Sequence, residues 1–530
     1  MSTITFPYLS LLTWLPALGA VLLLFVNTDK LAKNVSLVVS LVTFLVSLFI
    51  LQGFDASNVG YQFYEEKMWI SSFGVRYALG VDGISLPLVI LTTFLMPIIV
   101  LASESVHKSL KGYLASMLIL ESAMLGTFLA VDAFLFYVFW ELMLAPMYFI
   151  IGIWGGKRRI YATIKFVLYT VFGSVLMFVA LFYVVWSYYN QSGTSVPSFL
   201  IQDLLSVRLS SKESIWLFAA MFLAFGIKIP LFPFHTWLPD AHVEAPTGGS
   251  VVLAGVLLKM GLYGLIRLAY PLFPSGAEFF TPIMALLAVI GIVYGALVAW
   301  VQTDIKKLVA YSSVSHLGYC VLGLVAMNEI SVTGSIYQML NHGISTGALF
   351  LLVGVLYDRK HTRLIADYKG LANKVPLFAF LFLVFTLSSI ALPLTNGFIG
   401  EFLILSGSFL TFPGLTMIAV SGVILGAVYM LTLYMKTIFG ELNEDKNGDL
   451  TDVNRRELVI FAPLFILVFV MGIYPQPILN LMKPSVQAFV TKVNNNSFAD
   501  IDTSQDEYSE TRPSPLELDG QIDKADNNHG

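Results

Sequence analysis

The sequence predicts an all-α polytopic membrane protein with about fourteen transmembrane helices. Hydrophobic residues make up 57% of the 530 residues, charged residues make up only 12%, and the mean hydropathy is +0.78. Soluble proteins carry about 25% charged residues, so this composition excludes a soluble globular protein. In addition, apolar stretches of about 20 residues, the length that crosses a bilayer, recur along the chain.

The expected helices divide the chain into blocks. Residues 1–110 hold three helices, residues 111–270 hold a first block of five, residues 278–440 hold a second block of five, and a last helix lies within residues 455–480. The segment 494–530 is acidic and poor in large apolar residues, so we expect it to be disordered. The helices are expected to begin near residues 8, 31, 79, 113, 133, 160, 215, 248, 282, 308, 332, 376, 415 and 458.

Lysine and arginine predict which loops face the cytoplasm, because cytoplasmic loops of membrane proteins are rich in both. Of the two alternating sets of loops, the poorer set holds only Lys67, Arg76, Arg208 and Lys212. We therefore expect a multi-pass protein of the bacterial inner membrane with both termini on the non-cytoplasmic side. The basic set of loops holds Lys30, Lys33, Lys108, Lys111, Lys306, Lys307 and the segments 157–159, 359–374 and 446–456.

Two of the expected helices are interrupted by proline. One runs into Pro230 just after Lys228, and the other runs into Pro393 a little before Glu401. Proline removes a backbone hydrogen bond, and unpaired backbone at membrane depth survives only inside protein or beside water. The breaks lie five helices apart, so the two five-helix blocks would be inverted repeats, as in transporters whose broken helices line an ion pathway. The alternative is a pair of unrelated proline kinks.

Glu141 and Lys228 are candidate functional residues because each lies inside a long apolar stretch. A charge in the middle of a bilayer costs at least about 2.5–3.5 kcal/mol, so such residues are rare and usually functional. If the two side chains approach, both hold their charge; if they separate, the buried lysine releases a proton. The alternative is a static structural salt bridge.

Lys259, His316 and His342 are further candidates, and Glu401 completes the set. Burial disfavours the charged form of a lysine, which suits a proton carrier, and histidine titrates near physiological pH. The alternative for Lys259 is a side chain that reaches the membrane surface. Each histidine is either a relay member or a hydrogen-bonded core residue, and neither has a second ligand at helical spacing that would suggest a metal site.

The sequence shows no site for a redox cofactor. It has neither a phosphate-binding loop nor a dinucleotide fingerprint, and its single cysteine, Cys320, can bind no cluster alone. We therefore expect no cofactor in this chain, and no nucleic-acid partner.

Several long motifs then follow one another in order: residues 139–148 around Glu141, residues 228–247, residues 304–318 and residues 341–343. Together they resemble the antiporter-like subunits of respiratory complex I over about residues 75–480. Glu401 is similar to the position that marks the chain M (chain 4) branch, since the related chains L and N tend to carry lysine there. The resemblance implies fourteen core helices and a polar axis at the membrane midplane. That axis would run through Glu141, Lys228, Lys259, His316, His342 and Glu401.

The resemblance further implies a proton-translocating membrane subunit of an NADH:quinone oxidoreductase, with all redox chemistry in other chains. The implied partners are the other membrane subunits, including neighbouring antiporter-like chains, the lipid bilayer, and quinone through the complex. Two alternatives share this scaffold. One is a subunit of a multi-chain monovalent cation/proton antiporter, and the other is a subunit of a ferredoxin- or hydrogenase-driven relative.

Overall fold

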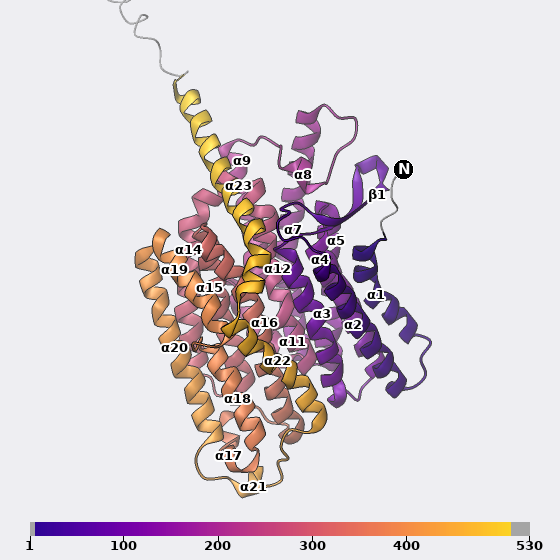
Figure 1. The fold of residues 1–530 in the computed structure, drawn as a ribbon, viewed down its shortest axis with the longest axis vertical. Helices are drawn as coiled ribbons and strands as arrows, with labels where there is room; N and C mark the ends of the chain where they lie inside the picture. Colours follow the sequence, from indigo (N-terminus) through magenta and orange to yellow (C-terminus); the bar gives the residue numbers. More distant parts are fainter. Residues whose placement is uncertain (1–5, 510–530) are drawn as a thin grey trace, which may run out of the picture.

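The computed structural model describes residues 6–509, and the side chains of residues 6–495, as a long bundle of helices (Figure 1). In this part of the chain, 11 helices are long and apolar enough to cross a membrane. The expectation of a polytopic helical membrane protein is therefore confirmed. The count of fourteen stays a prediction for three shorter or more polar segments, α1 (Tyr8–Leu23), α9 (Ser211–Lys228) and α18 (Pro376–Ser389).

The first half of the bundle contains the expected N-terminal helices and the first block of five. Its helices are α2 (Asp29–Gln52), α3 (Ser85–Leu101), α4 (Leu110–Leu129), α5 (Ala133–Leu142), α6 (Leu144–Trp154), α7 (Arg159–Ser192), α8 (Ile201–Leu204), α10 (Trp237–Glu244), α11 (Thr247–Val252), α12 (Leu258–Gly264) and α13 (Tyr270–Leu272). Single turns of 3₁₀-helix, η1 (Ser71–Phe73), η2 (Ala102–Ser105) and η3 (Phe234–Thr236), and π-helices η4 (Leu253–Leu257) and η5 (Leu265–Ala269) lie between them.

The second half contains the second block and the C-terminal helices. Its elements are α14 (Pro274–Trp300), α15 (Ile305–Val325), α16 (Glu329–Lys360), η6 (Ile365–Asp367), α17 (Leu371–Lys374), α19 (Asn396–Thr411), α20 (Pro413–Ile438), α21 (Glu444–Asn447), α22 (Arg455–Ile473) and α23 (Gln476–Ser509). The two expected breaks are confirmed, because α9 stops at Lys228 before α10 and α18 stops before α19. Each break occupies the fourth segment of its block, although the inverted relation of the blocks stays a prediction.

Burial separates a central layer of helices from a lipid-facing shell. The spans made by α11–α13, by α15 and by α16 are each 94% buried, whereas α2 is 28% and α20 33% buried. Lipid-facing helices can be apolar all round, but polar residues in a membrane protein need neighbouring helices to cover them. The three central spans are therefore where polar side chains can gather.

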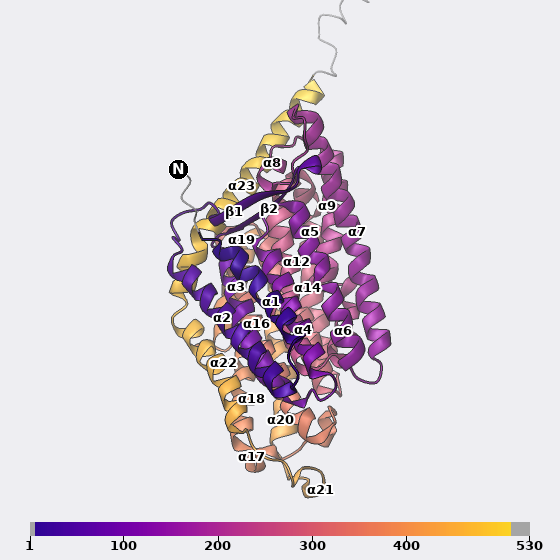
Figure 2. The same ribbon diagram turned by 90° about the vertical axis from the view of Figure 1, so that its right-hand side faces the viewer.

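The bundle has two different ends. Figures 1 and 2 show the described N-terminus, the β-hairpin and the far end of α23 at one end, and α17 and α21 at the other. We call the first the hairpin end. The second, here the basic end, carries the lysine- and arginine-rich segments 359–374 and 446–456. The loops thus separate as expected, and their assignment to the two faces of a membrane stays a prediction.

Two expectations about the fold were wrong. A helix was expected to begin near residue 79, but β1 (Gln62–Ile70) and β2 (Val75–Val81) pair there as an antiparallel hairpin, and α3 begins only at Ser85. The second half of β2 is buried against the bundle. A buried strand and a buried helix are equally apolar, so the apolar run alone did not distinguish them.

The boundary of the C-terminal tail also needs correction. Disorder was expected from residue 494, but the helix α23 continues to Ser509; residues 510–530 lie outside the described part of the chain. Val486 and Phe489 pack against the bundle and fix the first half of this helix. A helix anchored in this way can extend over polar residues, since its backbone hydrogen bonds are satisfied without a core.

The segment 233–246, which holds no lysine or arginine, is mostly buried helix. Trp237 and His242 in α10 are both fully buried. The segment is the second half of the first broken helix, folded back into the protein. Its three prolines and two histidines concealed this from a hydropathy reading.

Candidate functional site

The three most buried spans bring three predicted residues together. Lys259 lies on α12, His316 on α15 and His342 on α16, and all three side chains are buried. Glu401, also buried, reaches them from α19, just beyond the second break. We call these four residues the central row, and the structure places them in contact in the order Lys259, His342, His316, Glu401.

A local irregularity of the backbone places Lys259. The π-helix η4 directly precedes α12, and the Leu258 amide bonds to the Leu253 carbonyl instead of to Ala254. The Ala254 carbonyl is therefore free, and the Lys259 ammonium donates to it. π-Helical turns of this kind are rare and occur mostly at functional sites.

Lys259 and His342 are arranged to share a proton. Lys259 Nζ lies 2.7 Å from His342 Nδ1, and that same nitrogen lies 3.2 Å from the Ala254 carbonyl. When the lysine is charged, it donates to an unprotonated Nδ1. When the lysine is neutral, Nδ1–H donates to the Ala254 carbonyl instead. Both protonation states therefore have a satisfied hydrogen bond in one geometry.

The other half of the row ends at a carboxylate. His316 Nδ1 lies 3.1 Å from Glu401 Oε1, and Gln338 Nε2 donates to the same oxygen over 3.1 Å. The imidazole ring of His316 has its centroid 5.9 Å from that of His342. Because Glu401 is buried beside a histidine and an amide donor, its charge is compensated by hydrogen bonds rather than by lysine or arginine.

Amide and hydroxyl side chains hold the second break in place. Asn341 donates to the Asn396 carbonyl over 2.8 Å, and Ser388 donates to the Asn396 side chain over 2.6 Å. Ser389, at the end of α18, contacts His316 Nε2 at 3.3 Å. These bonds satisfy polar groups that the broken helix would otherwise leave unpaired in an apolar environment.

Glu141 and Lys228 are placed differently from the central row. The structure contains no ion pair between them, and neither Lys228 Nζ nor Glu141 Oε1 has a hydrogen-bond partner among the described residues. The ammonium of Lys228 instead lies 5.3 Å from the Trp140 ring centroid and 5.6 Å from that of Phe166. Lys228 is buried, whereas Glu141 is only half-buried. The expected pair is thus not formed in this state of the protein.

A third helix break lies beside Glu141, which the sequence interpretation did not use. The span from Ala133 to Trp154 divides at Met143 into α5 and α6. Pro146 has no amide hydrogen for the Leu142 carbonyl, which explains the division. Glu141, Lys228 and Glu401 are three charged residues in apolar stretches, and each lies near a proline. Each of them therefore lies at an interrupted helix.

Glu121, His235, His242 and Lys306 are among the buried ionisable residues that were not assigned a role from the sequence. The carboxylate of Glu121 and both ring nitrogens of His235 and His242 have no hydrogen-bond partner among the described residues. Lys306 donates to the Ala245 carbonyl over 2.5 Å. Only Glu121 stands out in the sequence, since it lies alone in an apolar helix; the others lie close to loops and other polar residues.

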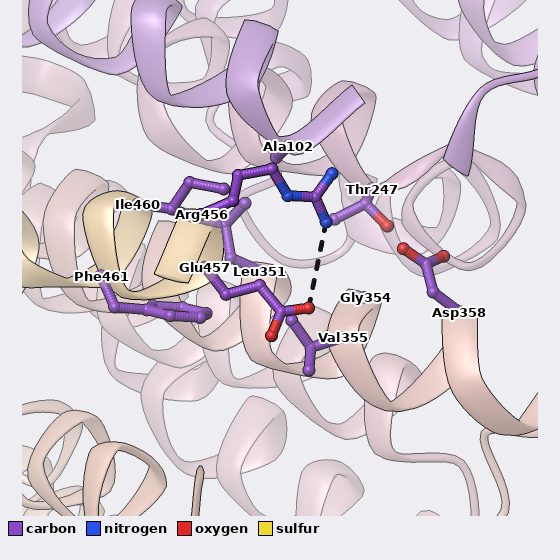
Figure 3. A pocket seen from close by; sticks show the side chains of 10 residues that line it. All are labelled: Ala102, Thr247, Leu351, Gly354, Val355, Asp358, Arg456, Glu457, Ile460 and Phe461. Carbon is purple, nitrogen blue, oxygen red and sulfur yellow. Dashed lines mark ion pairs between the residues drawn. The ribbon is translucent and has the colours of Figure 1, made fainter. Parts of the chain in front are cut away.

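A polar cavity of about 550 Å³ lies at the basic end. Lys306, Glu244 and Tyr113 line its buried side, and His107 and His361 lie among the residues nearer the loops. A smaller adjoining pocket shares Thr247 and Asp358 with it. Figure 3 shows Arg456 and Glu457 facing each other in that pocket, 4.0 Å apart. A cavity of this size and polarity holds water, so solvent reaches deep into the basic end.

No cofactor site emerges from the described residues. Cys320 is buried in α15, and within residues 6–509 no group of three or more His, Cys, Asp or Glu side chains is placed to bind a metal ion. In the central row, Lys259 bonds to His342 and His316 bonds to Glu401, whereas His342 Nε2 has no hydrogen-bond partner among the described residues. What the row can do chemically is move protons between neighbouring nitrogen and oxygen atoms.

Comparison with known proteins shows the family to which this chain belongs. Residues 130–426 match the model of the NADH:quinone oxidoreductase/Mrp antiporter transmembrane family, and residues 11–132 match the amino-terminal model of NADH-ubiquinone oxidoreductase chain 4. The NADH-quinone oxidoreductase subunit M of Rhodobacter capsulatus is 47% identical, over 93% of this chain and 98% of its own. This chain belongs to the subunit M (chain 4) family. The resemblance found in the sequence is thereby confirmed.

Other members of the subunit M family are similarly close. The protein from Rickettsia prowazekii is 44% identical over 92% of this chain and 99% of its own. Among solved structures, a chain of the respiratory complex I from Thermus thermophilus with bound NADH has a TM-score of 0.84 and 32% identity. It aligns with 92% of this chain and 99% of its own length, so the fold is shared from end to end.

Proposed function

We propose that this chain is a proton-translocating membrane subunit of an NADH:quinone oxidoreductase. It would act as a translocase subunit: electron transfer takes place in other chains of the complex, and this chain moves protons through the membrane. Its membership of the subunit M family supports the parent complex. The central row supports the proton pathway.

One observation carries the proposal. Lys259 and His342 share a 2.7 Å contact, and the row continues through His316 to Glu401 without leaving the protein interior. Ionisable residues within transmembrane segments are costly, and chains of them are typical of proton relays in pumps. Stability does not require such a row, because well-packed apolar residues of similar volume stabilise a membrane bundle at least as well.

The proposed order of events follows from the contacts. A charge change in a neighbouring subunit brings Glu141 and Lys228 together or apart, and this shifts the charge that Lys259 experiences. Lys259 then transfers its proton to His342, and His316 receives it on the way to Glu401. Moving one charge against 100 mV costs about 2.3 kcal/mol, so the neighbouring subunit must change the lysine's proton affinity by about one to two pKa units.

The surroundings of the chain are proposed from the same reasoning. The neighbours are the other membrane subunits of the complex, including antiporter-like chains, and the lipid of a bacterial inner membrane. Quinone acts only through the complex. Since basic loops face the cytoplasm, the basic end and its water-filled cavity lie on that side, and the hairpin end with both termini lies on the other.

The test is Lys259→Ala in the whole complex, reconstituted into vesicles. We expect redox-driven acidification to fall at least tenfold, equivalent to about 1.4 kcal/mol or more of lost coupling. The matched control is Lys446→Ala, which removes a surface lysine that pairs with Asp367 at 2.8 Å and should leave acidification unchanged. Full acidification by the Lys259→Ala complex would refute the proposal.

A second function remains in competition, because the matching family model also covers Mrp antiporters. A subunit of a monovalent cation/proton antiporter would exchange sodium for protons in vesicles without any redox substrate. Mass spectrometry of the co-purifying subunits separates these two functions. It also identifies a ferredoxin- or hydrogenase-driven complex, whose redox subunits differ.

A further inference from the structure

The hairpin end contains a buried ion pair that the proposed pathway does not use. Arg267, on η5, pairs with Asp82, which lies in the turn between β2 and α3. Their side chains are only 13% and 6% exposed. Asp82 also accepts hydrogen bonds from the Ile84 and Ser85 amides, over 3.0 and 2.9 Å. Burial and these two backbone hydrogen bonds to Asp82 hold the ion pair in one position.

The pair lies on the helix face that carries Lys259. Residues 259, 263 and 267 are spaced by four, which places them on one side of a helix, and Arg267 is about 12 Å from Lys259 along its axis. Tyr263 lies between them, and Arg267 Nε donates to its hydroxyl oxygen over 3.0 Å. A polar stripe therefore runs from Lys259 towards the hairpin end.

The Tyr263 hydroxyl and Arg267 Nε on this stripe are both hydrogen-bonded, and Arg267 Nη2 forms the ion pair with Asp82. The Tyr263 hydroxyl donates to the Phe128 carbonyl over 2.7 Å while it accepts from Arg267, so it has no free proton to pass on. The guanidinium also lies against the Tyr61 and Tyr263 rings, at 5.5 and 5.2 Å. The Ser485 hydroxyl of α23 accepts a hydrogen bond from the Gly83 amide over 3.1 Å, and this bond fixes the turn that holds Asp82.

We propose that Arg267 is a positioning residue that closes this route to protons. An arginine stays charged at all accessible pH values, and a fixed positive charge in a narrow polar passage excludes protons and cations. Tyr263 holds the guanidinium across the passage through its hydrogen bond, and Asp82 balances the charge. Lys259 then exchanges no proton with the hairpin end and discharges only sideways, to His342. This inference rests on the proposed function of Lys259.

The two ends of the Lys259 span differ in the way this closure requires. Towards the basic end, the span begins at Thr247, which lines the water-holding cavity. Towards the hairpin end, it reaches the ion pair and the cover provided by α23. An open route at one end and a closed one at the other would make Lys259 accessible from a single side of the membrane.

The experiment measures passive proton leak in vesicles that contain the whole complex, without NADH, as the decay of an imposed pH difference. In Arg267→Gln the positive charge is lost and Asp82 remains as a proton acceptor, so we expect a several-fold faster decay. In Asp82→Asn the same ion pair is broken but the arginine charge remains, so we expect no leak. Arg267→Lys keeps the positive charge, so the pH difference should decay no faster than in the wild type.

Two further variants separate the closure from a merely structural role. Arg359→Gln breaks an equally buried pair, Arg359 with Glu457 at 2.7 Å, at the basic end, and it should not leak. Adding Lys259→Ala to Arg267→Gln should abolish the leak, because the route runs through the lysine. Complexes are compared only after native-gel analysis has shown that they are assembled.

Three results would overturn the closure: no leak in assembled Arg267→Gln complexes, an equal leak in Asp82→Asn, or a leak that persists without Lys259. Each leaves the proposed function standing, because that function is judged by redox-driven acidification in Lys259→Ala alone. Conversely, full acidification in Lys259→Ala would remove the proposed function whatever the leak measurements show.

Discussion

Lys228 and Lys259 are both lysines buried in apolar helices of this protein, but their surroundings are opposite. The Lys259 ammonium has two partners, the Ala254 carbonyl and His342, and His342 in turn lies beside the His316 ring. The Lys228 ammonium faces two aromatic rings and has no hydrogen-bond partner among the described residues. An uncompensated buried ammonium costs several kcal/mol, so Lys228 is the site whose charge depends most on a change nearby.

The difference suggests a division of labour. The central row joins most of its polar atoms by hydrogen bonds, with His342 Nε2 left without a partner among the described residues, and can store or pass a proton within the chain. The Glu141–Lys228 region is incomplete by itself, and Glu141 is only partly buried within the chain. A neighbouring subunit that covers Glu141 would therefore control Lys228 before it affects Lys259.

The largest loss of proton transport is expected from Glu141→Ala or Lys228→Ala, and these variants test the comparison of the two lysines most directly. Either variant should cut redox-driven proton transport about tenfold, equivalent to about 1.4 kcal/mol. Both complexes should still assemble, since neither Lys228 Nζ nor Glu141 Oε1 has a hydrogen-bond partner among the described residues. Acidification by the reconstituted complex and native-gel analysis provide the two readouts. Wild-type pumping by either variant would show that the unpartnered region is not coupled to the row.

A smaller effect is expected from Gln338→Leu in the central row. The variant removes one hydrogen bond to Glu401, and such bonds to charged groups contribute about 1.5–3 kcal/mol. Pumping should fall by several-fold, with the row's other contacts intact. The control is Gln487→Leu, which removes a glutamine–glutamate hydrogen bond of 2.8 Å at the surface. An equal loss of pumping in the two variants would mean that the buried hydrogen bond to Glu401 contributes no more to function than one at the surface.

The smallest effect is one of accessibility alone. Dicyclohexylcarbodiimide is an apolar reagent that couples to carboxyl groups in membranes. It should label Glu141 in the isolated chain, where this residue is half exposed, and not Glu401, which is buried. In the whole complex the label on Glu141 should disappear, as read by peptide mass spectrometry. Labelling of Glu141 that is unchanged in the complex would contradict control by a neighbour.

The comparison also shows what a sequence reading can reach. Glu141, Lys228, Lys259 and Glu401 stand out because a charge within an apolar run is conspicuous, and the two proline breaks were located for the same reason. Which partners they meet was not predictable, since helices distant in sequence supply them: Lys259 contacts His342, 83 residues away, rather than a carboxylate.

Other features left no readable signal. The π-helix η4 has an ordinary apolar composition, and nothing in its residues distinguishes it from an α-helix. His242 lies among prolines and charged residues typical of a loop, yet it is fully buried and stacks on Phe350 at 4.5 Å. The hairpin and the helical start of the tail were missed because both depend on packing against the bundle, which a single sequence does not reveal.

The freed carbonyl of Ala254 has a consequence for how this protein can change over evolutionary time. The register of the Lys259 helix is set by one surplus backbone residue, not by any side chain that could be exchanged gradually. Removing a single residue there, for example Gly255, would restore regular winding and return the freed carbonyl to the helix's own backbone hydrogen bonding. Lys259 would then lose this acceptor in one step, so insertions and deletions, more than substitutions, limit what this stretch of chain can tolerate.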